Sequence, residues 1–416
     1  MSETYEETSL RVKRFASTDV LVVGGGPAGC AAAVAAAREG KSVTLIEQSG
    51  MLGGAATLSG VAIFMIVGNF TGFYKEVVRA IRPDFEDSVE DPSKVKVRFN
   101  PLLLRLALMR MLDNAGVHVA YHADFIASHE TNAGREVIFN TVEGLCSIQA
   151  SVVVDASGNG RVAIEAGASY TSGDELDGSV QPMSMMFQMQ NTGAPVPSLL
   201  PDGCEEYHEV SDLPQGRVLK WESAGDGTLL VNMTRVAGNG SLVDDLNRAE
   251  AESLKQVFST ACYLQHHGFE TYVLSSVGSQ VGVRESNQVE CLYTLTEEDL
   301  LEGRRFKDVV AQSNYNIDIH GATSSDGTEE RPIERYDIPY RCMVPKGVRG
   351  ILVAGRSISC THVAISSARV MPTCFALGQA AGIAAAIALD RRCDLADVPS
   401  DDLERRLAEH GVEFDG

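Results

Sequence analysis

One stretch near the start of the chain, residues 21–48, constrains the fold more than any other. It reads LVVGGGPAGCAAAVAAAREGKSVTLIEQ. The β-branched run Val20–Val23 has the length of a buried parallel strand. Residues 31–37 are nearly all alanine, the best helix former, and a second apolar strand over residues 42–46 follows Gly40. This order of strand, helix and strand predicts a βαβ unit of the dinucleotide-binding kind.

The turn between the first strand and the helix fits the pattern G-x-G-x-x-G. Gly24 allows the tight turn, Gly26 lets the backbone approach a pyrophosphate, and Gly29 allows the helix to pack closely on the strand. The N–H groups of the first helical turn would then point at the phosphates. Glu47 ends the next strand, where a carboxylate accepts the hydroxyls of an adenosine ribose. An acid there disfavours NADP because it repels a 2′-phosphate, and it leaves NAD and FAD open.

Composition excludes several classes of partner. The chain has 416 residues, enough for two domains, and 56 acidic against 35 basic side chains give a net charge of −21. Such a surface repels nucleic acid and anionic membranes, so we expect neither as a partner. Residues 1–19 lack the apolar core of a signal peptide, and no apolar run resembles a membrane span. The nine cysteines include no C-x-x-C pair, so we expect a cytoplasmic protein without a metal site.

The pattern of residues changes twice along the chain. From about residue 173 apolar and polar residues alternate, as in antiparallel strands, and a long amphipathic helix covers residues 242–267. The pattern of a buried parallel strand returns over residues 350–356, and a small-residue helix follows over residues 372–389. We therefore predict an α/β fold. A discontinuous Rossmann-like domain spans residues 17–175 and 335–416, an inserted α+β substrate or cap domain spans residues 176–334, and residues 1–16 form a flexible N-terminal arm.

The late strand and helix distinguish between the two dinucleotides. A strand ILVAGR followed by ALGQAAGIAAA resembles the closing element of the glutathione-reductase-like flavoproteins, which bind FAD. LGGAAT, VVVDASGNG, PMSMMFQM, VGVRES, IDIH and DIPYRCMVPKGV occur in the same order as in the bacterial FAD-dependent oxidoreductase family, near the fumarate reductase and succinate dehydrogenase flavoproteins. This resemblance implies an FAD-binding domain and an oxidoreductase. No second G-x-G-x-x-G follows a strand, so no nicotinamide domain is expected.

The resemblance also implies which positions contact FAD. They belong to the glycine-rich turn, the loop after the second strand, the ends of two later strands and the last long helix. They are Gly24, Gly26, Pro27, Ala28, Gly29, Glu47, Gly53, Gly54, Ala55, Asp124, Ala156, Ser157, Gly158, Gly355, Arg356, Gly378, Gln379, Ala380, Ala381 and Gly382.

Four residues are candidates for catalysis. His362 and Arg369 lie between the closing strand and helix, where the related fumarate reductases carry a His and an Arg that hold substrate carboxylate. His320 shares a strand face with Asp318, which would orient the imidazole. Arg284 belongs to the VGVRES motif. Each also has a purely structural reading, as a hydrogen-bonded core histidine or part of a buried ion pair.

One departure from the family bears on the ligand. Asn287 and Gln288 stand where we expect two arginines in the relatives. If those arginines shape the substrate pocket, the ligand of this protein is less anionic than that of its relatives.

The sequence predicts an FAD-dependent oxidoreductase that exchanges a hydride between flavin and a small-molecule metabolite. Dehydrogenation of a C–OH or C–C bond and the reverse reduction both suit this scaffold. Three alternatives stay open: an electron-transfer component with a partner chain, a monooxygenase, and a non-catalytic FAD-binding regulator. The electron donor or acceptor is not indicated, and a homo-oligomer is compatible with this sequence.

Overall fold

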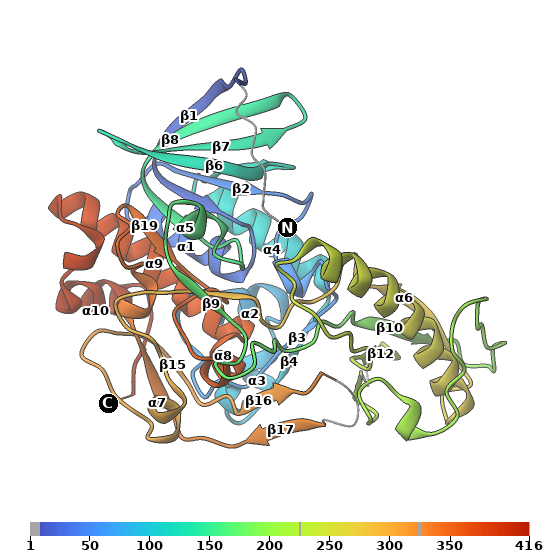
Figure 1. The fold of residues 1–416 in the computed structure, drawn as a ribbon. Helices are drawn as coiled ribbons and strands as arrows, with labels where there is room; N and C mark the ends of the chain where they lie inside the picture. Colours follow the sequence, from blue (N-terminus) through green and yellow to red (C-terminus); the bar gives the residue numbers. More distant parts are fainter. Residues whose placement is uncertain (1–8, 224–225, 323–326, 416) are drawn as a thin grey trace.

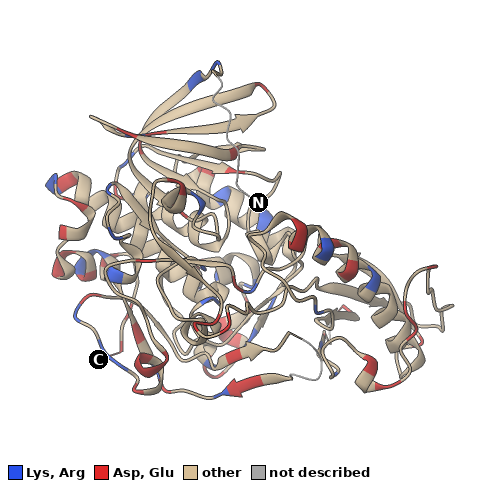
Figure 2. Cartoon of the chain, viewed as in Figure 1, with Lys and Arg blue, Asp and Glu red and all other residues tan. Residues whose placement is uncertain are grey.

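The computed structural model describes residues 9–223, 226–322 and 327–415. The chain forms a large lobe around a twisted sheet and a smaller lobe that contains the long helix α6 (Val243–His266), as Figure 1 shows. Acidic and basic residues alternate along α6 and along α10 (Ser400–Glu409), so neither helix presents a face of one charge in this view (Figure 2).

The centre of the large lobe is a parallel sheet. Strand β1 (Lys13–Val23) lies between β2 (Val43–Glu47) and β8 (Gly144–Asp155), β5 (His118–Tyr121) pairs with β2, and β19 (Ile351–Val353) pairs with β8. All four pairings are parallel. Residues 20–23 and 43–47 are buried, and most of these residues are apolar without alternation, as expected for parallel strands covered on both faces. The predicted Rossmann-like α/β fold is confirmed.

One predicted boundary, the end of the N-terminal arm, differs from the structure. Residues 147–149 and 151–155 belong to the single strand β8. Its first half pairs with β7 (Gly134–Thr141), which pairs with β6 (Asp124–Thr131). The arm was expected to reach residue 16, yet β1 begins at Lys13, which lies opposite Cys146. Backbone pairing with β8 orders residues 13–16, and residues 1–8 lie outside the described part of the chain.

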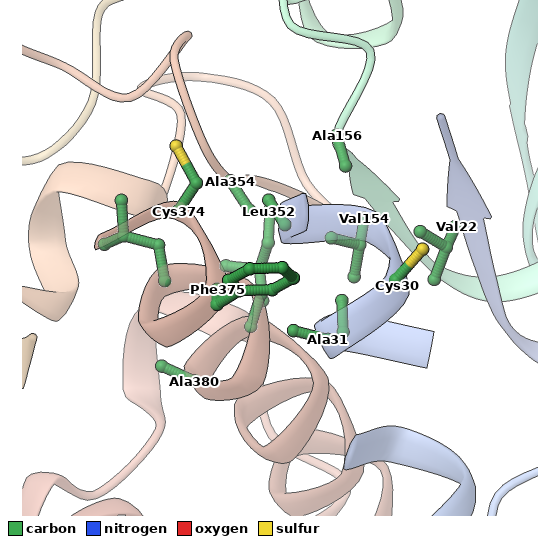
Figure 3. Packing of buried hydrophobic residues seen from close by; sticks show 14 of the residues in the cluster. Val22, Cys30, Ala31, Val154, Ala156, Leu352, Ala354, Cys374, Phe375 and Ala380 are labelled. Atoms are coloured by element: carbon green, nitrogen blue, oxygen red, sulfur yellow. The ribbon is translucent and has the colours of Figure 1, made fainter. Parts of the chain in front are cut away.

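Helices α1 (Pro27–Arg38) and α9 (Met371–Arg391) pack directly against each other. A Cβ added at Gly378 would lie 2.0 Å from the Ala28 carbonyl oxygen, and one at Gly382 would lie 2.2 Å from that of Ala32. Figure 3 shows this part of the core, where Phe375 and Ala380 of α9 lie near Ala31 of α1. Within the described residues α9 is the one helix apolar enough to cross a membrane, contrary to the sequence expectation, but 89% of its apolar window is buried inside the protein.

The remaining elements of the large lobe surround this centre. The helices are α2 (Gly72–Ile81), α3 (Phe85–Ser88), α4 (Pro101–Asn114), α5 (Arg161–Glu165), α7 (Glu297–Leu301) and α8 (His362–Ala368). Two-stranded sheets join β3 (Ile63–Phe64) to β4 (Val97–Arg98), β9 (Tyr170–Ser172) to β14 (Asn287–Val289), β15 (Val309–Ser313) to β18 (Tyr336–Pro339), and β16 (Ile317–His320) to β17 (Thr328–Arg331).

The inserted region builds a sheet of its own. Its order is β11 (Lys220–Glu222), β12 (Thr228–Val231), β10 (Phe187–Asn191) and β13 (Tyr272–Val277), all antiparallel. This sheet and α6 share a second hydrophobic core, whose residues fall within 183–283. Residues such as Val289, Val310 and Ile317 belong to the core of the large lobe instead. The predicted domain end at residue 334 stays a prediction, and this packing favours an earlier end.

The contact between α1 and α9 yields a test of the fold. Gly382→Ala should lower the free energy of unfolding by about 1–3 kcal/mol, because the new methyl group meets backbone that can move only with its helix. Helix propensity alone predicts the opposite sign, a gain of about 1 kcal/mol. Urea unfolding monitored by circular dichroism measures the change.

Ala408→Gly, on an exposed turn of α10, is the matched control and should report propensity alone. A more stable Gly382→Ala protein would show that the two helices are not in close contact.

Candidate active site

A single cavity of about 780 Å³ runs from the glycine-rich turn to the inserted region. Thirteen of the predicted cofactor residues line it, and they come from the ends of β1, β2, β8 and β19, from the loops that follow, and from the starts of α1 and β6. They are Gly24, Gly26, Pro27, Ala28, Glu47, Gly54, Ala55, Asp124, Ala156, Ser157, Gly158, Gly355 and Arg356. The tertiary structure therefore brings most of the predicted nucleotide site together.

The glycine-rich turn has the geometry of a phosphate site. Helix α1 begins at Pro27, its N-cap residue Gly26 has no side-chain cap, and both residues line the cavity. Gly26 faces Gly54 of the following loop, since a Cβ at residue 26 would lie 4.0 Å from the Gly54 Cα. The uncapped start of this helix can therefore meet a pyrophosphate without obstruction by a side chain. These residues fit FAD.

Glu47 is positioned by backbone groups at the adenosine end. Its Oε2 accepts a hydrogen bond from the Gly25 N–H at 2.6 Å, and its Oε1 accepts one from the Ser49 N–H at 2.7 Å. Each carboxylate oxygen has a second lone pair, so both can still accept a ribose hydroxyl. Nearby, Asp124 lines the cavity and pairs with Arg161 at 2.6 Å, which orients both side chains.

Buried charged side chains fix the loops at the ends of β8 and β19. Asp155 accepts hydrogen bonds from Ser157 and from the N–H groups of Val162 and Ala163. The Arg356 guanidinium donates to the Gly158 carbonyl, the Asn159 side chain and the Val283 carbonyl. Burial lowers the pKa of Arg356 to about 10, so it is still charged at neutral pH. Arg356 thus links the nucleotide end to the inserted region.

Seven predicted cofactor positions do not line the cavity. Gly29 approaches the Gly24 carbonyl so closely that a Cβ would lie 1.8 Å away, and Gly53 adopts a left-handed turn with a φ of +107°. Both residues determine the backbone shape of the loops that line the cavity, without lining it themselves. Gly378, Gln379, Ala380, Ala381 and Gly382 lie in the middle of α9 rather than at its start, and their contact with the cofactor stays a prediction. Gly378 and Gly382 allow α9 to pack closely on α1. The Gln379 side chain accepts a hydrogen bond from the Phe73 N–H and donates one to the His410 carbonyl.

Three predicted catalytic residues meet at the other end of the cavity. Arg284, His320 and Arg369 all line it, together with Asp318. Arg369 is 9% exposed, and its Nη2 donates to the Asp318 carbonyl oxygen at 3.0 Å and lies 3.8 Å from the carboxylate. Arg284 Nη1 donates to the Pro182 carbonyl at 2.6 Å. This cluster is called the inner cluster below.

Asp318 organises the inner cluster. Its Oδ2 accepts a hydrogen bond from the Tyr315 hydroxyl at 2.9 Å and lies 3.3 Å from His320 Nε2. Burial would raise the pKa of Asp318, but these hydrogen bonds and the charge of Arg369 lower it, so Asp318 is ionised. Burial and the charge of Arg284 lower the pKa of His320 to about 3, which keeps its imidazole neutral. A carboxylate only accepts, so the proton of His320 lies on Nε2.

His362, which the resemblance predicts as a catalytic residue, does not line the cavity. Its Nδ1 lies 2.9 Å from the fully buried Glu285 carboxylate, and its backbone N–H donates to Glu175. Burial lowers the pKa of His362, but the hydrogen bond and charge of Glu285 raise it by more, so the net shift is upward. The structural reading of this histidine is the one that its contacts favour.

Sequence reasoning missed much of the cavity wall. Trp221, the one tryptophan of the chain, lines it, and so do Lys96, Tyr315 and the pair formed by Arg217 and Glu330. None belongs to a motif, and they come from distant segments of the chain: Lys96 precedes β4, and the others belong to the inserted region. Asn287 and Gln288 lie in β14 and do not line the cavity, so their departure from the family pattern does not alter the cavity wall.

His362 yields a prediction about pH. A pKa that is raised in the folded state stabilises the protein below 6.5, the ordinary pKa of a histidine, and this stabilisation is lost as pH rises through the folded-state pKa. His362→Asn should remove that part of the pH dependence, measured by urea unfolding at a series of pH values on either side of neutrality. His129→Asn is the control, because His129 pairs with Glu136 at the surface and should leave the slope unchanged. Equal slopes in wild type and His362→Asn would contradict the assignment.

The glycine-rich turn yields a second prediction. Gly26→Ala should weaken FAD binding at least tenfold, because the methyl group occupies the space where backbone meets pyrophosphate. The stability of the protein without FAD should change by less than about 0.5 kcal/mol, since the nearest atom to the new Cβ is 4.0 Å away. Titration of the FAD-free protein, monitored by flavin fluorescence, measures the affinity.

Gly29→Ala is the contrasting variant, because its Cβ would meet the Gly24 carbonyl oxygen and should destabilise the fold itself. Wild-type FAD affinity in Gly26→Ala would place the pyrophosphate elsewhere.

Comparison with known proteins finds several flavoprotein-like matches of limited identity or coverage. A urocanate reductase of Eggerthella lenta is 50% identical over 72 residues, which are 17% of this chain and 10% of that protein. Two solved structures match at low identity. A geranylgeranyl bacteriochlorophyll reductase-like protein from Thermoplasma acidophilum matches with 13% identity and a TM-score of 0.48, covering 94% of this chain and 83% of that one. An anhydrotetracycline hydroxylase from Streptomyces rimosus matches with 14% identity and a TM-score of 0.46, covering 95% and 66%.

One protein family matches nearly the whole length of the chain. The family is named "FAD dependent oxidoreductase", and its match spans residues 19–407, which include the glycine-rich turn, the inserted region and helix α9. This chain therefore belongs to the FAD dependent oxidoreductase family.

Proposed function

We propose that this enzyme exchanges a hydride between FAD and a small-molecule metabolite that binds at the inner cluster. One observation carries the proposal: a single cavity joins the nucleotide-binding turn to a group of buried polar side chains. The reaction is dehydrogenation of a C–OH or C–C bond or the reverse reduction. Bound FAD supplies the hydride chemistry, and the protein must position the metabolite and manage one proton.

The inner cluster has groups for both tasks. Arg284 and Arg369 offer N–H donors that orient a polar metabolite. His320 holds its proton on Nε2, next to Asp318, so Nδ1 is the nitrogen that can accept a proton. Thr328 Oγ1 lies 3.4 Å from that nitrogen. An ionised Asp318 beside the imidazole favours proton uptake, which is the role of a carboxylate that orients a general base.

The inserted region supplies the wall opposite the nucleotide turn. Ser184, Met186 and Trp221 line the cavity from this region, and Arg217 pairs with Glu330 of β17 at 3.0 Å. A wall of this kind excludes water from the reacting atoms, which strengthens the electrostatic interactions there. The similarity to a protein named urocanate reductase is compatible with the reductive direction.

Anaerobic titration of the FAD-loaded protein tests this function. One class among hydroxy acids, polyols, amines and enoates should bleach the flavin absorbance, or reoxidise flavin that dithionite has reduced. His320→Gln should slow that step by about 10²-fold, the usual contribution of a positioned acid–base group, and keep FAD bound. His129→Gln, at an exposed site, is the control. Reduction only by a partner protein would favour an electron-transfer component, and oxygen consumption coupled to NAD(P)H would favour a monooxygenase.

A further inference from the structure

One face of the inserted sheet forms a wall of the cavity. Side chains alternate between the two faces of a strand, and Arg217, Leu219 and Trp221 all line the cavity. Val231 of β12, which pairs with Lys220, belongs instead to the core shared with α6. None of the predicted cofactor residues comes from the inserted region, so this face is open to the metabolite. It is called the sheet wall below.

The position of Trp221 in the sheet wall is fixed from two sides. Arg98 of β4 donates from Nη1 to the Trp221 carbonyl at 3.1 Å and from Nη2 to the Thr228 hydroxyl at 2.8 Å. Lys96 Nζ lies 6.0 Å from the centroid of the Trp221 ring, at the outer limit of a cation–π contact. A ring held in this way offers a flat surface that loses little further freedom when a ligand binds.

The cavity lining around this ring is apolar. The side chains that share the lining with Trp221 on the large lobe and in the inserted region are Ile63, Met65, Ile66, Met186, Leu219 and Ile333. Residues 65, 66 and 333 are only half-buried, so each keeps apolar surface that a ligand can cover. Strand β4, which holds Trp221 through Arg98, also pairs with β3 and so places Ile63 close by.

An unused hydrogen-bond acceptor belongs to the same wall. The Asn232 N–H donates to the Leu219 carbonyl at 3.0 Å, so these two residues lie opposite each other and their side chains share a face. Among the described residues the Asn232 side chain has no hydrogen-bond partner, and its Oδ1 is buried. Asn232 lines the cavity, so rotation of its amide brings this oxygen to a ligand. A buried acceptor without a donor is costly, and an O–H or N–H of the ligand would satisfy it.

We propose that the metabolite has a flat aromatic body that packs on Trp221, and that an O–H or N–H group on this body donates to Asn232 Oδ1. This inference rests on the proposed function, because it takes the ligand beside FAD to be the metabolite that exchanges the hydride. Aromatic rings gain more on tryptophan than burial alone provides, and the sulfurs of Met65 and Met186 make favourable contacts with ring edges. An aliphatic body of the same size gains only the burial.

The charged side chains beside Trp221 do not favour a charged body. Arg217 pairs with Glu330 at 3.0 Å, and Lys96 is exposed to solvent. A charge on the ring would lose its hydration against the apolar lining without gaining a buried partner. The aromatic body is therefore neutral.

The experiment uses three probes of similar size on the FAD-loaded protein, without reductant: phenol, anisole and cyclohexanol. Phenol has both features, anisole lacks the O–H donor, and cyclohexanol lacks the aromatic ring. Calorimetric titration should show saturable binding of phenol, and the other two should bind more weakly by about fivefold or more. Trp221 is the one tryptophan of the chain, so a change in tryptophan fluorescence locates bound phenol at the sheet wall. Equal or tighter binding of anisole or cyclohexanol would overturn the proposal.

Two variants separate the two features. Trp221→Leu should remove the preference for phenol over cyclohexanol and keep the preference over anisole, and Asn232→Leu should do the opposite. Flavin absorbance shows that FAD stays bound in each. Asn114→Leu, at the exposed end of α4, is the control and should alter neither preference. Trp221→Phe, a smaller change, should keep both preferences.

The same variants can contradict the assignment. A purely structural role of Trp221 or Asn232 would weaken the binding of all three probes alike, and that result would overturn the proposal. Loss of FAD from Asn232→Leu with unchanged preferences among the probes would assign the amide to the flavin and would also overturn it.

This inference and the proposed function fail separately. Selective phenol binding in a protein whose flavin no metabolite reduces or reoxidises would support the aromatic site and contradict hydride exchange. Efficient flavin reduction by an aliphatic metabolite, with no preference for phenol among the probes, would do the reverse.

Discussion

Contact between backbone atoms, with no side chain between them, is the constraint on which the rest of this structure depends. Gly29 brings α1 against the Gly24 carbonyl, and Gly378 and Gly382 bring α9 against the backbone of α1. Because these contacts leave no room for a Cβ, the two helices and strand β1 hold one fixed spacing. That spacing places the uncapped start of α1 at the carboxyl ends of the parallel strands, where open α/β sheets bind their ligands.

The cavity that results is shared by segments far apart in the chain. Arg356 donates to Gly158, Asn159 and Val283, so one buried side chain joins the ends of β19 and β8 to the inserted region. At the other end, Arg369 follows α8 and Asp318 lies in β16. Burial makes each of these charged groups depend on its partners, since a buried charge without a counter-charge is costly. The polar contacts therefore specify how the inserted region sits over the nucleotide site.

The sequence predicted local features of the site better than those that depend on tertiary contacts. The glycine-rich turn and the acid that follows are local features, and Gly24, Gly26 and Glu47 line the cavity. The resemblance assigned residues 378–382 to the cofactor. Small residues suit both ligand approach and helix packing, and only the position of α9 shows that Gly378 and Gly382 contact α1. The resemblance suggested His362 for catalysis, and the sequence does not show that Glu285, 77 residues away in the chain, lies beside its Nδ1.

By itself the sequence determined the βαβ unit, the dinucleotide-binding turn, the inserted region and the family, because each depends on short-range spacing or on an ordered set of motifs. Only the tertiary structure decided which polar residues meet at the inner cluster. Arg284, Tyr315, Asp318, His320 and Arg369 come from several segments, and no periodicity records the distances between them. Their charges and pKa values follow from burial and from one another, so they exist as a site only once the inserted region has packed against the sheet.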